Sequence, residues 1–179
     1  YESGFGERAA GGGEAITADT VCWIFSMTKP LAGTAAMQLV EQGKLDLHAP
    51  ASEWIPYLGE VQVLEGFGTN NEPILRAPKR AITLTDLLTH TAGFGNVIWD
   101  EKTKRYTETQ GLPAANTGDI RGLEIPLVFD PGDRWLYSIS IDWVGKMVEA
   151  ASGKTLGTFM QDHIFHPLGM HSTSFKISP

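Results

Sequence analysis

The sequence predicts a mixed α/β (α+β) protein, in which an antiparallel β-hairpin is followed by a mainly helical region. Two observations lead to this prediction: a glycine turn between two strand-like segments near the start, and apolar residues three or four apart in several later segments. The 179 residues are 42% hydrophobic and 20% charged, which is ordinary for a chain that buries a core. We expect one domain or part of a larger one.

The hairpin is predicted from two strand-like segments, residues 1–10 and residues 14–25. The three glycines at 11–13 tolerate the positive φ angles that a tight turn requires. Larger apolar residues alternate with smaller ones in the second segment, as a strand requires: Val21, Trp23 and Phe25. The single cysteine, Cys22, has apolar neighbours, so we expect a small buried residue on this strand rather than a reactive thiol.

The hydrophobic period changes at Ser26, where a helix is predicted to begin. Apolar residues then recur at spacings of four and form one stripe: Leu31, Ala32, Ala35, Ala36, Leu39 and Val40. Pro30 lies in the first turn, where a missing amide hydrogen costs little, and Gly43 is the expected C-terminal stop. Ser26 is therefore predicted at a junction between a strand and a helix.

Three further helices are predicted downstream of this one. The first has Thr83 as its N-cap and Asp86 at its third position. The other two cover residues 141–151 and 155–165, where apolar residues again follow a helical period.

Two long segments are predicted to be mostly loop. Residues 59–81 carry glycines, prolines and basic residues, and residues 94–122 are polar without a periodic pattern. A loop as long as the second is usually functional or disordered in a compact domain.

The charge and composition argue against several classes of function. The net charge is −7 and the lysines and arginines are scattered, so we expect no nucleic-acid partner. The five histidines form no metal-ligand pattern and there is one cysteine, so we expect no metal and no cofactor. No apolar run approaches the ~20 residues that span a bilayer. No leader peptide is visible, which favours the cytoplasm, but the chain begins without methionine and secretion stays open.

Ser26 and Lys29 are three residues apart and would lie on the same face of a helix. A serine hydroxyl is a weak nucleophile, which needs a base within reach and a group that stabilises the oxyanion. A neutral lysine one turn along could be that base, and a charged one could lower the pKa of a third group. The same pair could equally be an N-cap serine and a solvated lysine, because about one Ser-x-x-Lys is expected by chance in such a chain.

A series of short motifs decides between these readings. In order and spacing they resemble the serine β-lactamase-like family, which includes class C β-lactamases, D-alanyl-D-alanine carboxypeptidases and family VIII carboxylesterases. The motifs are Thr-x-Asp-Thr-Val (17–21), Phe-Ser-Met-Thr-Lys (25–29), Gly-Lys-Leu-Asp-Leu (43–47), Leu-Leu-Thr-His-Thr-Ala-Gly (87–93), Phe-x-Pro-Gly (129–132), Tyr-Ser (137–138) and Phe-x-Pro-Leu-Gly-Met (165–170). The resemblance covers roughly residues 15–175.

The resemblance implies roles for particular residues. Ser26 matches the family nucleophile, and Lys29 matches its motif partner. Tyr137 matches the tyrosine that works with the lysine as general base and then as acid toward the leaving group. A nearby ammonium would favour the Tyr137 phenolate, whereas the alternative is a packing residue with its hydroxyl on a backbone group. His90 is interpreted as structural, closing a helix and positioning a loop, rather than as a general base.

Ile139 departs from the pattern of the enzymes that act on β-lactams and peptides. Those enzymes carry asparagine two residues after the tyrosine, and an apolar side chain cannot make its hydrogen bonds. The run 137–142 is more similar to the esterase branch, which implies cleavage of short-chain carboxylic esters through an acyl-enzyme on Ser26. A β-lactamase, a D-aminopeptidase, an acyltransferase and a non-catalytic member of the fold remain alternatives. Trp99 and Trp135 could form part of an apolar acyl site or belong to the core.

The resemblance implies a β-lactamase/transpeptidase-like fold, with an antiparallel sheet flanked by helices plus a mainly helical region. Residues 1–25 would form the sheet hairpin and residues 26–179 the mainly helical part of one catalytic domain. No Lys-Thr-Gly, His-x-Gly or Trp-x-Gly motif follows Tyr137, and the usual opening helix and strand are missing before Tyr1. We therefore expect a fragment of a longer enzyme or part of a split protein, with a sheet edge open to association.

Overall fold

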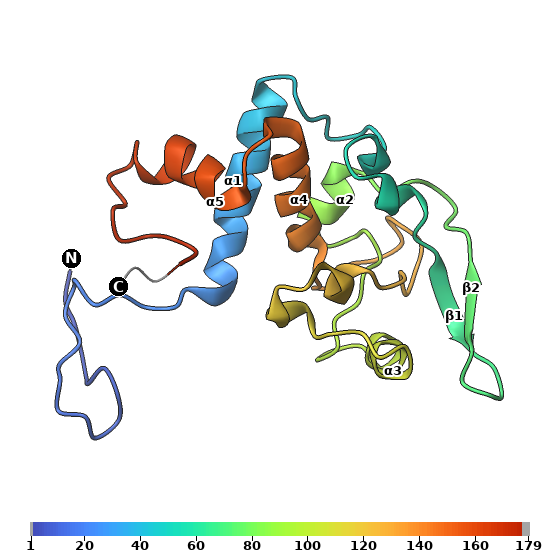
Figure 1. Cartoon of the computed structure of the whole chain (residues 1–179), viewed down its shortest axis with the longest axis horizontal. Helices are drawn as coiled ribbons and strands as arrows, with labels where there is room; N and C mark the ends of the chain where they lie inside the picture. Colours follow the sequence, from blue (N-terminus) through green and yellow to red (C-terminus); the bar gives the residue numbers. More distant parts are fainter. Residues whose placement is uncertain (1, 177–179) are drawn as a thin grey trace.

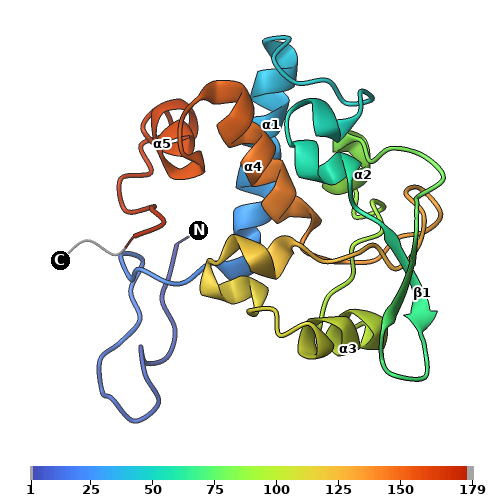
Figure 2. The same ribbon diagram turned by 45° about the vertical axis from the view of Figure 1, so that its right-hand side comes forward.

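Two helices packed against each other form the centre of the molecule in the computed structural model, which describes residues 2–176 (Figures 1 and 2). They are α1 (Thr28–Glu41) and α4 (Ser140–Ser152). Helix α2 (Leu84–Leu88) packs against α4, and α5 (Leu156–Met160) contacts both central helices. None of the helices in the described part of the chain is long and apolar enough to cross a membrane.

The facing sides of α1 and α4 make up the middle of the hydrophobic core. Their fully buried residues are Ala35, Ala36 and Leu39 on α1, and Val144, Met147 and Val148 on α4. The small alanines of α1 allow the two helices to approach closely while α4 contributes the larger side chains. The stripe predicted for the first helix is therefore confirmed. Its end is also confirmed, because Gly43 adopts the left-handed φ of 68° just beyond it.

Helix α2 begins with the capping box that the sequence predicts. The Thr83 hydroxyl accepts a hydrogen bond from the Asp86 amide at 3.2 Å, and the Asp86 carboxylate accepts one from the Thr83 amide at 3.0 Å. Arg80 donates two further hydrogen bonds to the Asp86 carboxylate, each of 2.7 Å. Asp86 is 4% exposed, so this ion pair holds the start of α2 at the edge of the core.

Asp86→Asn should lower the free energy of unfolding by about 2 kcal/mol at neutral pH, because an amide replaces a carboxylate that accepts two charge-assisted bonds. Burial raises the pKa of Asp86, but the bonds from Arg80 and Thr83 outweigh it and hold this pKa below its ordinary value of 3.8. The stabilisation is therefore present above the unfolded-state pKa and is lost as the pH falls through the lower folded-state pKa.

Urea unfolding of the wild type and of Asp86→Asn measures this difference, with Glu41→Gln as the control because Glu41 is exposed. We expect Glu41→Gln to change the free energy of unfolding little. The difference in this free energy between the wild type and Asp86→Asn should become smaller as the pH falls. An equal loss in both variants would contradict the assignment.

The two later predicted helices are confirmed, with one local difference. Helix α4 ends at Gly153, which has a φ of 69°. The predicted helix over 155–165 starts as α5, with Thr155 as its N-cap, and continues as a single π-helical turn over Gln161–Phe165.

A two-stranded antiparallel sheet lies where the sequence predicts loop. Strands β1 (Val63–Phe67) and β2 (Pro73–Arg76) pair with an irregular register between Leu64 and Gly66. The strands are short, and a charged residue, a glycine and a proline interrupt their alternation, so the sequence carries no clear period of two.

A helix interrupts the second predicted loop. Helix α3 (Glu101–Thr109) is capped by Asp100, whose side chain accepts a hydrogen bond from the Thr103 amide at 2.7 Å. Thr103 is the one buried residue of this largely polar helix, so the sequence has no apolar stripe that would indicate the helix.

Of the N-terminal hairpin predicted over residues 1–25, the described residues 2–25 form the glycine turn with a few hydrogen bonds beside it, but not the two strands, and residue 1 lies outside the described part. Residues 2–24 form an extended arm, drawn in blue in Figure 1, in which a single bridge joins Glu7 and Ala15. Three large apolar side chains in and just after the arm are mostly exposed, at 69%, 74% and 75%: Val21, Trp23 and Phe25. A two-stranded ribbon without a covered apolar face is marginal, which explains the near absence of pairing. Cys22, predicted to be buried on a strand, is exposed on this arm.

Candidate active site

Ser26 lies in a single 3₁₀ turn, Phe25–Met27, that leads directly into α1. Phe25 has a φ of 44°, a left-handed conformation that is costly for an aromatic residue, and it turns the chain sharply before the helix. Lys29 follows in the first turn of α1. The predicted helix junction at Ser26 is confirmed, although an extended arm rather than a strand precedes it.

Tyr137 joins these two residues although it lies 111 positions beyond Ser26. Its hydroxyl donates a hydrogen bond of 2.7 Å to the Ser26 Oγ, and the Lys29 Nζ donates one of 3.3 Å to the same oxygen. The Lys29 Nζ also lies 5.0 Å from the centre of the Tyr137 ring. The structure therefore brings all three predicted site residues together around one oxygen atom.

The surroundings of Tyr137 favour its deprotonated form. The hydrogen bond with Ser26, and then the interaction with Lys29, lower the pKa of Tyr137 from its ordinary value of 10.0. Partial burial and the negative charge of Asp142 oppose this shift but do not reverse it. A phenol that loses its proton more readily is better suited to accept one from a serine.

His90 lies against Tyr137 and not against Ser26. The ring centroids of His90 and Tyr137 are 4.8 Å apart. The His90 Nδ1 accepts a hydrogen bond from the Ser138 amide at 3.3 Å. Within residues 2–176, no hydrogen bond joins His90 to Ser26, which supports a structural role over that of a general base.

Ile139 is buried, with 8% of its surface exposed, and it directly precedes α4. It offers no polar group at the position two residues after Tyr137. The hydroxyls of its neighbours Ser138 and Ser140 are buried and hydrogen-bonded to each other at 2.7 Å. This serine pair, which sequence reasoning did not single out, fixes the chain directly after Tyr137, and the Ser-x-Ser pattern is the signal that marks it.

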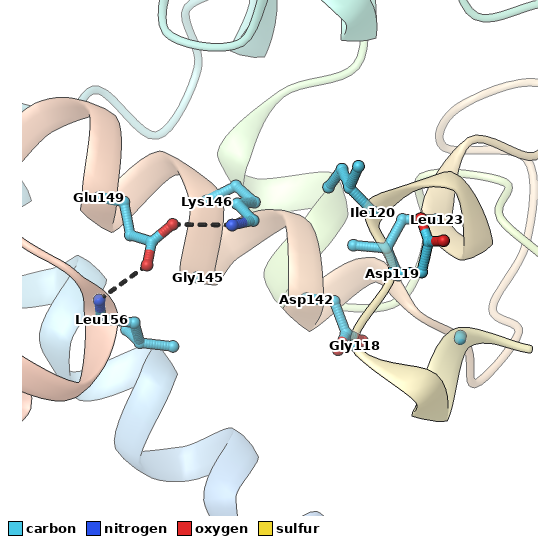
Figure 3. A pocket seen from close by; sticks show the side chains of 10 residues that line it. Gly118, Asp119, Ile120, Leu123, Asp142, Gly145, Lys146, Glu149 and Leu156 are labelled. Atoms are coloured by element: carbon cyan, nitrogen blue, oxygen red, sulfur yellow. Dashed lines mark hydrogen bonds and ion pairs between the residues drawn. The ribbon is translucent and has the colours of Figure 1, made fainter. Parts of the chain in front are cut away.

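A pocket of about 230 Å³ opens beside the start of α4 (Figure 3). Its apolar lining includes Ile120, Leu123 and Leu156. Its polar lining includes a hydrogen-bonded pair, Lys146 and Glu149, 2.9 Å apart. Part of the wall comes from the segment 94–122, for which a functional role is expected from its length.

Asp142 connects this pocket with the residues around Ser26. It lines the pocket, and although the residue as a whole is exposed, protein atoms around its carboxyl raise the pKa of Asp142 by desolvation while the charge of Lys29 lowers it. Asp142 was not predicted as a site residue.

Neither of the two tryptophans considered from the sequence belongs to the core. Trp99 is 67% exposed and Trp135 is 64% exposed, so the core alternative is wrong for both. Trp135 contacts His90 edge to face, with ring centroids 6.4 Å apart, and so lies near Tyr137.

Comparisons with known proteins agree with this geometry. The family described as Beta-lactamase matches residues 1–179. Acyltransferase mokF of Monascus pilosus is 38% identical over 160 residues, which cover 89% of this chain and 39% of that protein. Lovastatin esterase of Penicillium rubens is 35% identical over 179 residues, which cover 98% of this chain and 45% of that protein.

A solved structure gives the same result for the fold. Unliganded simvastatin synthase (LovD) from Aspergillus terreus aligns with a TM-score of 0.80 at 37% identity, over 87% of this chain and 40% of that one. The chain thus spans about two fifths of the length of the relatives it matches. The predicted resemblance and the β-lactamase/transpeptidase-like fold class are confirmed. The chain belongs to the β-lactamase family.

Proposed function

We propose that the protein cleaves esters of short carboxylic acids through an acyl-enzyme on Ser26. The observation that carries this proposal is the convergence of Tyr137 and Lys29 on the Ser26 Oγ, at 2.7 and 3.3 Å. A nucleophile, a phenol with a lowered pKa and a cation beside that phenol can supply the attack and the proton transfer of such a reaction.

The reaction follows from these positions. The Ser26 Oγ attacks the ester carbonyl while the Tyr137 phenolate, stabilised by Lys29, takes the hydroxyl proton. The bond between the carbonyl carbon and the alcohol oxygen then breaks, and Tyr137 gives the proton to the departing alcohol. In the second half, water attacks the acyl-serine and loses a proton to Tyr137. The bond between the carbonyl carbon and the Ser26 Oγ then breaks, Tyr137 returns the proton to the Ser26 Oγ, and the acid is released.

Two further observations support esters over amides. Ile139 is buried and apolar, so the chain presents no amide there to hold the peptide-like group of a β-lactam or peptide. The relatives carry the names acyltransferase and esterase, which are names for ester-level acyl chemistry. We place the acyl or alcohol part of the ester near Trp135 and in the pocket beside α4, whose volume of about 230 Å³ fits a small group.

An alcohol is a second candidate acceptor for the acyl group. The names acyltransferase mokF and simvastatin synthase favour transfer over hydrolysis. Both outcomes share the acyl-enzyme on Ser26 and differ only in the molecule that attacks it.

Mixing the protein with p-nitrophenyl butyrate should give a burst of about one equivalent of p-nitrophenol, followed by slower turnover. An added alcohol separates the two acceptors, because transfer forms a butyrate ester and lowers the yield of free butyrate per p-nitrophenol. Nitrocefin should be hydrolysed much more slowly than the ester. A folded protein that releases no p-nitrophenol, either in a burst or in slow turnover, would contradict the proposal and favour the non-catalytic alternative.

A further inference from the structure

The chain segment that carries Tyr137 is attached to a single residue, His90, by three contacts. The His90 carbonyl accepts a hydrogen bond from the Leu136 amide at 2.9 Å. The Nδ1 of its ring accepts one from the Ser138 amide at 3.3 Å. The same ring packs against the Tyr137 ring at a tilt of 40°, with centroids 4.8 Å apart. The residues before and after Tyr137, and Tyr137 itself, are therefore all held by His90.

The backbone of His90 has the left-handed conformation that ends helix α2. Its φ is 57°, in the left-handed region that a non-glycine residue rarely adopts. His90 follows directly after helix α2, which packs on α4 and so gives it a rigid base. The Thr91 amide bonds to the Asp86 carbonyl at 2.9 Å, as in the usual left-handed end of a helix, so the end of α2 presents the His90 carbonyl and ring to the Tyr137 segment.

The protonation state of the ring decides whether one of these contacts, the hydrogen bond from the Ser138 amide, can form. A backbone N–H can only donate, so the hydrogen bond from the Ser138 N–H requires an unprotonated Nδ1. Burial, and then the charge of Lys29, lower the pKa of His90 below its ordinary value of 6.5. The imidazole is thus neutral at neutral pH, with its proton on Nε2.

The charged and titratable groups around this ring come from each of the elements that surround it. Lys29 of α1 disfavours the imidazolium, and Tyr137 packs against the ring. The acidic side chain of α2, Asp86, is held by Arg80, and Asp142 of α4 acts on Tyr137. Among the described residues, neither of these carboxylates raises the pKa of His90.

We propose that His90 is a positioning residue that holds Tyr137 against the Ser26 Oγ only while its imidazole is neutral, and so steepens the loss of activity in acid beyond that caused by protonation of Tyr137. The proposal rests on the proposed function of Ser26 and Tyr137. When Nδ1 is protonated, its N–H and the N–H of Ser138 point at each other, so this hydrogen bond cannot form. The segment 136–138 then loses one of its three contacts, and Tyr137 loses its fixed distance from Ser26.

The rate at which a fluorophosphonate labels Ser26, measured against pH, tests this proposal. In that step the Ser26 oxygen bonds to phosphorus, fluoride leaves, and the serine proton passes to Tyr137. In the wild type, the logarithm of the rate should fall with a slope of about one as Tyr137 is protonated. The slope should approach about two at the lower pH where His90 is protonated as well.

His90→Asn is the decisive variant. Asparagine tolerates a positive φ, its Oδ1 can accept from the Ser138 amide, and it does not titrate. We expect it to label within about 3-fold of the wild-type rate at neutral pH, with a slope that stays near one in acid. His90→Gly also tolerates the backbone conformation but offers no acceptor, and should label about 10- to 100-fold more slowly at every pH.

Circular dichroism and urea unfolding show whether each variant is folded, so a loss of rate is separated from a loss of structure. A wild-type acidic slope in His90→Asn, or a wild-type rate in His90→Gly, would overturn the role of His90. Failure of the proposed function looks different, because the wild-type protein itself would then not be labelled at Ser26 at any pH.

Discussion

Ser26→Ala should abolish covalent labelling by a fluorophosphonate and reduce ester turnover by about 10⁴- to 10⁶-fold, as expected for the loss of a nucleophile that acts as a unit with its base. The Ser26 Oγ is the atom on which both Tyr137 and Lys29 converge. Alanine leaves the other two side chains without an oxygen to activate. The residual rate would come from substrate binding and from solvent.

The loss should be one of chemistry and not of folding. Ser26 is exposed, so its hydroxyl contributes little to the core, and the midpoint of urea unfolding should stay near that of the wild type. Ser172→Ala is a matched control, because Ser172 is also an exposed serine, far along the chain. Intact mass spectrometry after labelling measures the stoichiometry, and labelling of Ser26→Ala at about one equivalent would refute the assignment.

Local patterns in the sequence were enough to predict the parts of the site that are close along the chain. Ser26 and Lys29 are separated by less than one helical turn, so the helix that follows fixes their relation. The capping box of α2 is equally local, since Thr83 and Asp86 satisfy each other. Tyr137 has no such relation to Ser26, and only the resemblance to a family connected two residues 111 positions apart.

The features that the sequence did not predict depend on distant contacts or lack an apolar signal. Helix α3 has one buried residue, Thr103, so its sequence shows no repeat of apolar residues from which a helix could be predicted. The alternation of Val21, Trp23 and Phe25 is typical of a strand, but a strand forms only where another strand and a covered face are available, and residues 2–24 have neither. The attachment of the Tyr137 segment to His90 likewise joins residues 48 positions apart.

Tyr137→Phe should lower the rate of acylation by about 10²- to 10⁴-fold, which is the usual contribution of a positioned general base. Phenylalanine keeps the ring that packs against His90 and Lys29, so the segment should stay in place while the proton acceptor is lost. Tyr106→Phe, which removes a hydroxyl from the half-buried Tyr106 of α3, is the control and should retain full activity.

The pH profile decides whether the lost hydroxyl is a proton acceptor or only an orienting group. Because the pKa of Tyr137 lies below 10.0, the wild-type rate should rise with pH and level off before the pH of an ordinary phenol. Tyr137→Phe should lose this rise, since the phenol whose deprotonation produces it is then absent. If the variant were slow but kept the rise, a different group would be the base, and Tyr137 would serve only to hold the Ser26 hydroxyl. A flat profile at a reduced rate would identify Tyr137 as the group that accepts the serine proton. The positive charge of Lys29 would then be what favours the Tyr137 phenolate.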